Sequence, residues 1–232
     1  MQIEPTRIVA IRHGETAWNR ETRMQGQLDI ALNANGLRQA RSLAAALADE
    51  AFDAIYSSDL LRAHQTAQAL AASYLAPIVT DVGLRERGFG VFEGFTFNEI
   101  AARWPEQSER WRRRDPDFAP DGGESLRDFY ARSIEATTRL AAAHPGETIA
   151  LVAHGGVMDC LYRAAARLDL QAPRSWQLLN ASVNRLLLTE SGLTLVGWND
   201  TYHLEDSSLD ESGDGETAAE RLGRPGALGG AT

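Results

Sequence analysis

Two short apolar runs of strand type, each followed by a histidine and a glycine, restrict this chain to a narrow set of folds. Ile8–Ile11 leads into Arg12 and His13, and Thr148–Ala153 leads directly into His154. In an open α/β sheet, ligands bind at the carboxyl ends of the strands. We therefore expect both histidines to meet at one edge of the sheet, with a guanidinium beside them. An imidazole next to a guanidinium suits attack on a phosphoryl group, so the pattern predicts phosphoryl-transfer chemistry.

Strand-like and helix-like patterns alternate along the rest of the chain, which is typical of α/β proteins with a largely parallel sheet. In residues 35–48, for example, apolar side chains recur at spacings of three and four. We predict a three-layer α/β/α sandwich with a mostly parallel sheet and a hairpin of the last two strands at its edge. The expected strands are 8–11, 54–56, 77–80, 148–153, 182–189 and 193–198, and the expected helices are 35–48, 60–74, 96–114, 124–144 and 156–168.

Length and composition fit one globular domain. The chain has 232 residues, of which 44% are hydrophobic and 24% charged. No apolar stretch approaches the roughly 20 residues of a membrane helix, and the first residues lack the pattern of a signal peptide. We therefore expect a cytoplasmic protein. A single domain should cover residues 1–204, and the acidic, glycine-rich segment 205–232 should be a mobile tail.

The charge balance excludes some partners. The formal net charge is −9, which argues against general nucleic-acid or membrane-surface binding. We expect a phosphorylated small molecule as the partner, and a monomer or a homodimer paired through the edge hairpin. The chain has no lysine, so every cationic contact with a phosphate must come from a guanidinium, which can be bidentate.

Other residues extend the predicted site. Arg62 lies in the first turn of the expected helix 60–74 and would project over the same sheet edge, where helix N-termini and arginines hold phosphates. Glu86 lies in a glycine-punctuated loop, as a general acid or base or as an ion-pair partner of Arg85 or Arg87. The single cysteine, Cys160, excludes an internal disulfide and fits helix packing.

Five segments, in order along the chain, resemble the histidine phosphatase superfamily, in the branch that contains cofactor-dependent phosphoglycerate mutase and its phosphatase relatives. The resemblance implies a phosphoglycerate mutase-like fold, and the final strands with the segment 199–204 also resemble the end of that domain. The five segments are Arg12-His13-Gly14-Glu15-Thr16 with Trp18-Asn19, Ser57-Ser58-Asp59-Leu60 with Arg62-Ala63 and Gln65-Thr66-Ala67, Leu84-Arg85-Glu86, Gly123-Glu124-Ser125, and Val152-Ala153-His154-Gly155-Gly156.

The resemblance assigns a role to each residue. His13 would be the nucleophile that forms a phosphohistidine, kept unprotonated by Arg12 and Arg62. The same guanidiniums would neutralise the phosphoryl oxygens, where most of the catalysis of phosphoryl transfer lies. Glu86 would protonate the leaving oxygen and then take a proton from water or an alcohol, aided by the negative charge of bound phosphate. The further contacts to the phosphoryl oxygens would be His154, Asn19 and the N–H of Gly155.

Two departures from the mutase pattern favour hydrolysis. Glycolytic mutases typically continue after the acid as Arg-His-Tyr-Gly, whereas this chain has Arg87-Gly88-Phe89-Gly90 and so lacks the tyrosine hydroxyl. The segment before Gly123-Glu124-Ser125 is also short, which leaves the site more open to water. We therefore predict a phosphatase that needs no metal or cofactor. The alternatives are a phosphoglycerate mutase, with 2,3-bisphosphoglycerate as its cofactor, and a phospho-ligand binding module without catalysis.

Two remaining features are less informative. The arginines of the segment 110–114 predict a solvated helix face or a lid that contacts the far end of the substrate, and the acidic net charge disfavours a nucleic-acid patch. His64, His144 and His203 form no metal-ligand pattern. We expect His64 to face away from the site and His144 to mark the end of a helix.

Overall fold

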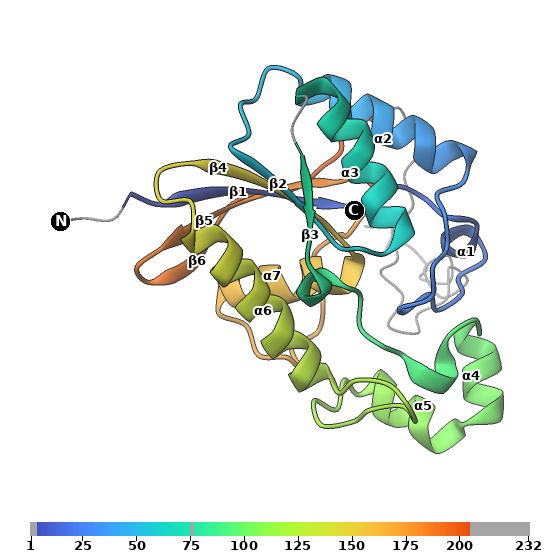
Figure 1. The fold of residues 1–232 in the computed structure, drawn as a ribbon. Helices are drawn as coiled ribbons and strands as arrows, with labels where there is room; N and C mark the ends of the chain where they lie inside the picture. Colours follow the sequence, from blue (N-terminus) through green and yellow to red (C-terminus); the bar gives the residue numbers. More distant parts are fainter. Residues whose placement is uncertain (1–3, 75–76, 205–232) are drawn as a thin grey trace, which may run out of the picture.

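A computed structural model describes residues 4–74 and 77–204 of the chain. Its centre is a six-stranded sheet in the order β3-β2-β4-β1-β5-β6 (Figure 1). The first four of these strands are parallel, and β5 runs antiparallel to both of its neighbours, β1 and β6. The mostly parallel sheet and the edge hairpin are therefore confirmed. The strands are β1 Thr6–Arg12, β2 Ala54–Ser57, β3 Ile78–Thr80, β4 Thr148–Ala153, β5 Val183–Thr189 and β6 Gly192–Asp200.

Helices cover both faces of the sheet, so the predicted three-layer sandwich is confirmed. Successive side chains of β1 point to opposite faces: Ile8 joins the apolar core under α6 and α7, whereas Val9 joins the core under α2 and α3. Cys160 is buried in the first of these cores, as expected. The helices are α1 Ala17–Arg20, α2 Ala34–Ala46, α3 Leu61–Tyr74, α4 Phe97–Arg103, α5 Pro105–Arg112, α6 Leu126–Ala142 and α7 Gly155–Ala166.

The region between β3 and α6 differs from the prediction. We expected one helix over residues 96–114, but the chain forms α4 and α5, which meet at an angle beyond one end of α6 (Figure 1). The break falls at Trp104, directly before Pro105, because proline disfavours helical geometry in the residue that precedes it. Pro105 then occupies the first turn of α5, where its missing N–H costs nothing. Two short 3-10 turns, η1 Val82–Leu84 and η2 Gly90–Phe92, were not predicted.

Helix α6 begins later than expected. Ser125 caps it by accepting a hydrogen bond from the N–H of Asp128 at 3.0 Å. Glu124 therefore lies outside the helix, in the connection from the lid segment, by which we mean residues 88–123. His144 lies just past the end of α6, as expected, and contacts Tyr56 and Glu147.

Two expectations reach beyond what the fold shows. In the described part of the chain, no helix is long and apolar enough to cross a membrane. The cytoplasmic location stays a prediction. The expected tail, residues 205–232, lies outside the described residues, and so the division into a domain over 1–204 and a tail is untested.

Candidate active site

The two histidines meet where the sequence predicts. β1 and β4 are adjacent parallel strands, and their register pairs Arg12 with Ala153. The residues that follow, His13 and His154, therefore lie side by side at the carboxyl edge of the sheet. Their ring centroids are 5.2 Å apart, and both side chains are buried.

Hydrogen bonding determines which nitrogen of His13 can react. Its Nδ1 lies 2.7 Å from the carbonyl oxygen of Gly14, and a carbonyl can only accept a hydrogen bond. The neutral ring therefore carries its proton on Nδ1 and a lone pair on Nε2. Burial lowers the pKa of His13 well below its usual value, and the charges of Arg62 and Arg12 lower it further. His13 is thus neutral, with a lone pair on Nε2 that could act as a nucleophile.

Arg12 and Arg62 are both buried beside His13. Backbone carbonyls hold their guanidiniums in place. Nη1 of Arg12 donates to Leu178, while Arg62 donates to Leu28 at 2.9 Å and to Gly26 at 2.7 Å. Both positive charges reach the two imidazoles, because each arginine lowers the pKa of both histidines. The arrangement is an electropositive site that suits a phosphoryl group.

His154 is fixed by a residue that the sequence analysis did not assign. Its Nε2 lies 2.8 Å from Oγ of Ser58, which follows β2, the strand on the far side of β4. Its Nδ1 is buried without a hydrogen-bond partner among the described residues. Burial lowers the pKa of His154 well below its usual value, with Arg62 and His13 as the next causes. His154 is therefore neutral as well, and it has one ring nitrogen for a ligand.

Two asparagines complete the surroundings of the nucleophile. Oδ1 of Asn19, on α1, accepts the N–H of Thr16 at 2.8 Å. Its Nδ2 is buried with no partner within the described residues, which fits the predicted contact with a phosphoryl oxygen. Asn180 was missed, although its Nδ2 donates to the carbonyl of His13 at 3.1 Å. It lies in a loop before β5 that carries no recognisable motif.

Glu86 reaches the same place from the loop after η1. Its Oε1 accepts the N–H of Arg87 at 2.8 Å, and its Oε2 accepts the N–H of Gly156 at 3.0 Å. Gly156 is the second residue of α7, so Glu86 lies at the helix end that follows His154. Of the two arginines considered as ion-pair partners, Arg85 pairs with Asp59.

Arg87, the second of these arginines, donates to the carbonyls of Glu124 and Phe118. Its guanidinium also lies over the ring of Trp111. Burial lowers the pKa of Arg87 to about 10. Arg85 and Arg87 thus both contact other groups, while the carboxylate of Glu86 lies at the first residues of α7, next to His154.

The two glycines after His154 make room for this chemistry. A Cβ atom on Gly155 would lie 3.3 Å from Nε of Arg12, and one on Gly156 would lie 2.2 Å from Oε1 of Glu86. A side chain at position 156 is therefore incompatible with the observed place of the carboxylate. Of the two glycines, only Gly155 was expected to contribute, as an N–H donor to the phosphoryl group. The role of Gly156 could have been suspected from the Gly-Gly pair at the start of a helix.

Two other predictions have mixed outcomes. Arg110, Arg112 and Arg113 are exposed and pair with acidic neighbours, as expected of a solvated helix face. That interpretation is wrong for Arg114, whose side chain is only 12% exposed and pairs with Asp159 of α7 at 2.9 Å. Nε2 of His203 lies 3.0 Å from the carbonyl oxygen of Ala181, and the N–H of Ala181 donates to the carbonyl of His13.

These residues define a class of protein: an enzyme that transfers phosphoryl groups through a histidine nucleophile. Among the described residues, no three His, Cys, Asp or Glu side chains gather as a metal site. Comparisons with known proteins support this class. The model of the histidine phosphatase superfamily (branch 1) matches residues 8–201. The chain belongs to this superfamily.

Relatives narrow the chemistry. A metal-independent phosphoserine phosphatase from Arabidopsis thaliana is 39% identical over 88% of this chain and 85% of its own length. Phosphoglycerate mutase-like protein 4 from the same plant is also 39% identical, over 92% of this chain and 93% of its own. The solved structure of a mycobacterial glucosyl-3-phosphoglycerate phosphatase has a TM-score of 0.75 at 34% identity and covers 85% of this chain and all (100%) of that chain. The chain is a phosphoric monoester hydrolase of this superfamily, with the phosphoglycerate mutase-like fold.

Proposed function

We propose that the protein hydrolyses an alkyl phosphate ester of a small metabolite through a phosphohistidine on Nε2 of His13. The observation that carries the proposal is the state of His13. It is buried, neutral, tied through Nδ1 to the Gly14 carbonyl, and placed beside two guanidiniums. These conditions leave a lone pair on Nε2 in an environment that attracts a phosphate.

In the first step, the lone pair of His13 Nε2 forms a bond to phosphorus as the bond to the ester oxygen breaks. Glu86 donates a proton to that oxygen, so the substrate leaves as an alcohol. Arg12 and Arg62 balance the charge on the phosphoryl oxygens, and neutral His154 donates a hydrogen bond to them; positioning and electrostatics supply most of the rate of such reactions. The Nδ2 of Asn19 and the N–H of Gly155 supply further hydrogen bonds.

In the second step, water attacks phosphorus and the P–N bond breaks. Glu86, now a carboxylate, takes a proton from the water, and inorganic phosphate and neutral His13 are formed. The backbone N–H groups of Arg87 and Gly156 orient the carboxyl in both steps. Negative charge on the bound phosphoryl group favours the protonated carboxyl that the first step needs.

Transfer to water, and not to a second phosphoglycerate, is supported by the lid segment. Phe89 lies where mutases carry a tyrosine, and its ring packs edge-on against Trp111 at a centroid distance of 5.1 Å. This position offers no hydroxyl to hold a small carboxylated substrate. Two relatives described as phosphatases support the same conclusion. Mutase activity is the second candidate, because another relative is described as mutase-like.

Phosphoserine and phosphoglycerate esters are the first substrates to test, because the similar phosphatases act on compounds of these kinds. We also propose that no metal or cofactor is needed. The donor set for the phosphate is made of arginines, histidines and amide N–H groups, and one relative is described as metal-independent.

A panel assay tests this function. The enzyme is treated with EDTA, and released phosphate is measured on phosphoserine, 3-phosphoglycerate and sugar phosphates, with His13→Ala as the control. A parallel assay follows the interconversion of 2- and 3-phosphoglycerate with added 2,3-bisphosphoglycerate. We expect phosphate release that EDTA does not reduce and that His13→Ala abolishes. Interconversion faster than release would establish the mutase, and no turnover in either assay would favour a binding module.

A further inference from the structure

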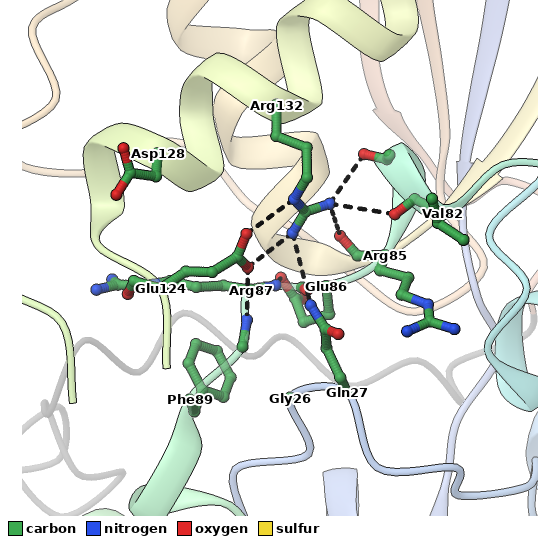
Figure 2. A network of polar contacts seen from close by, with 12 residues as sticks. Gly26, Gln27, Val82, Arg85, Glu86, Arg87, Phe89, Glu124, Asp128 and Arg132 are labelled. Carbon is green, nitrogen blue, oxygen red and sulfur yellow. Dashed lines mark hydrogen bonds and ion pairs between the residues drawn. The ribbon is translucent and has the colours of Figure 1, made fainter. Parts of the chain in front are cut away.

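A second polar network lies behind the loop that carries Glu86. Its centre is Arg132, on α6, which the sequence analysis did not single out. Figure 2 shows the guanidinium of Arg132 between the carboxylate of Glu124 on one side and backbone carbonyls of the loop on the other. Neither Arg132 nor Glu124 belongs to the phosphate-binding group around His13.

The contacts of Arg132 converge on the backbone around the proposed acid. Nη1 donates to the carbonyls of Gly83 at 2.9 Å and Arg85 at 3.0 Å, and Nη2 donates to the carbonyl of Glu86 itself at 3.2 Å. With the carbonyl of Val82, which Nη1 contacts at 3.5 Å, four carbonyls of the loop point at one guanidinium. Glu86 lies outside the strands and helices, and its carbonyl also accepts Nε2 of Gln27 at 3.1 Å.

Glu124 closes the network on the other side of Glu86. Its carboxylate receives Nε and Nη2 of Arg132 at 2.9 and 2.8 Å, in the fork geometry that arginine and carboxylate favour. Its Oε2 also accepts the N–H of Gly88 at 2.8 Å. Arg132 thus contacts the backbone at residues 83, 85 and 86, and Glu124 contacts it at residue 88. These contacts lie on both sides of Glu86 in the chain.

The donor count of Arg132 excludes a direct contact with substrate. A guanidinium has five N–H groups. Here six acceptors surround them: the two oxygens of Glu124 and the carbonyls of Val82, Gly83, Arg85 and Glu86. The side chain has no donor left for a phosphate, so its contribution to the reaction has to pass through the loop.

We propose that Arg132, together with Glu124, is the positioning residue for proton transfer by Glu86. This inference rests on the proposed function, in which Glu86 is the general acid. A carboxyl works as an acid only within hydrogen-bond reach of the leaving oxygen, and small displacements are costly. Breaking the network lets the loop shift, which moves the acid while the group around His13 stays in place.

Leaving groups separate this role from a general structural one. An alkyl ester such as phosphoserine needs a proton on its leaving oxygen, whereas p-nitrophenyl phosphate releases a stable phenolate without one. General acid catalysis contributes roughly 10²- to 10⁴-fold. We expect Arg132→Met to lower kcat on phosphoserine by about 30- to 100-fold and to change kcat on p-nitrophenyl phosphate by less than about threefold. Arg132→Lys should restore part of the loss.

Arg139 offers a matched control on the same helix. It pairs with Asp81 at the start of the same loop, but its side chain is 56% exposed and contacts nothing at Glu86. Arg139→Met should change neither kcat by more than about twofold, as is usual for exposed ion pairs. Glu124→Gln carries the same test as Arg132→Met if the latter does not fold, which a thermal melt shows.

The outcomes separate the two proposals. A selective loss on phosphoserine in both Glu86→Gln and Arg132→Met supports both. A selective loss in Glu86→Gln, with an equal loss or none on the two esters in Arg132→Met, overturns the positioning role alone. No selective loss in Glu86→Gln overturns the general acid, and the positioning role with it.

Discussion

The phosphate-binding residues of the proposed active site and the lid segment are built in different ways. The phosphate-binding residues are buried, and strand ends, a helix start and backbone carbonyls hold them in place. They are Arg12, His13, Arg62 and His154. The lid segment, residues 88–123, lies outside the three layers and has its own small apolar core, centred on Phe92, Ile100 and Phe118. We therefore propose that the sheet edge determines the reaction and that the lid segment, which can change without altering the sheet, determines substrate choice.

The comparison predicts its largest effect at Arg62. Arg62→Lys keeps the charge, but one ammonium cannot span the carbonyls of Gly26 and Leu28 and also hold a phosphate. Removing one donor to a developing charge typically costs roughly 10²- to 10³-fold, and we expect a loss of about that size in kcat/KM. The same change at the exposed Arg110 of the lid segment should have almost no effect. Similar losses at both positions would contradict the division between the regions.

Gly156→Ala tests whether the site beside the phosphate-binding residues tolerates a displaced Glu86 carboxylate. The new methyl would lie 2.2 Å from Oε1 of Glu86, so the carboxylate has to move. We expect kcat on an alkyl phosphate to fall by about 10²-fold, the lower end of the range for a lost general acid. Gly197→Ala is the control, since its Cβ meets its nearest neighbour at an ordinary 3.9 Å. Steady-state kinetics near wild type in Gly156→Ala would show that the carboxylate can work from another place.

The burial of two neutral histidines should appear in the stability of the fold. The pKa values of His13 and His154 are lowered in the folded state, whereas an unfolded histidine titrates near about 6.5. Below that pH the unfolded chain binds protons at these histidines and the folded chain does not, so the free energy of unfolding falls as the pH falls. Above it, these residues add no slope. The expected slope is about 1.4 kcal/mol per pH unit for each histidine, a tenfold change in the unfolding constant.

Urea unfolding of wild type and His13→Ala between pH 5 and 7.5, in buffer free of phosphate, measures this slope. His13→Ala should lower the slope by the contribution of one histidine, about 1.4 kcal/mol per pH unit. A slope unchanged by the substitution would mean that His13 is already charged in the folded protein. The account of the nucleophile would then fail.

The smallest effect is expected in the lid segment. Trp111 packs against Phe89 and under the guanidinium of Arg87, at 4.4 Å from ring centroid to Cζ. Each contact of this kind is worth about 0.5–1.5 kcal/mol. Trp111→Leu should therefore raise KM by less than about tenfold and leave the rate of phosphoenzyme formation near wild type. Rapid-quench kinetics would separate the two, and a large fall in the phosphorylation rate would make the lid segment part of the chemistry.

The phosphate-binding residues could be predicted from the sequence because local sequence patterns identify them. A strand followed by histidine and glycine, and an arginine in a first helical turn, place side chains by rules that need no distant partner. Ser58 stood in one of the family segments but received no role, and Asn180 and Arg132 gave no local signal. Each acts through contacts across long stretches of chain: Ser58 on His154, Asn180 on the His13 carbonyl, and Arg132 on the Glu86 loop.

The lid segment was predicted less well, for two different reasons. Its helix break was readable, because Pro105 carries a local rule that the prediction of one helix over 96–114 overlooked. The buried pair of Arg114 with Asp159 was not readable, because nothing in the arginine run distinguishes Arg114 from its exposed neighbours. Surface helices take their roles from what they pack against, and a single sequence does not contain that partner.

The central claim, that neutral His13 attacks through Nε2, is tested most directly by phosphorus NMR of the trapped phosphoenzyme. Labelling with a rapidly reacting ester, followed by alkaline denaturation, preserves an acid-labile phosphohistidine. Correlation of its phosphorus with the ring protons of isotopically labelled histidine distinguishes the two nitrogens. We predict one phosphoryl group on Nε2 of His13 and none in His13→Ala. A phosphoryl group on Nδ1, on His154 or on a residue other than histidine would contradict the account.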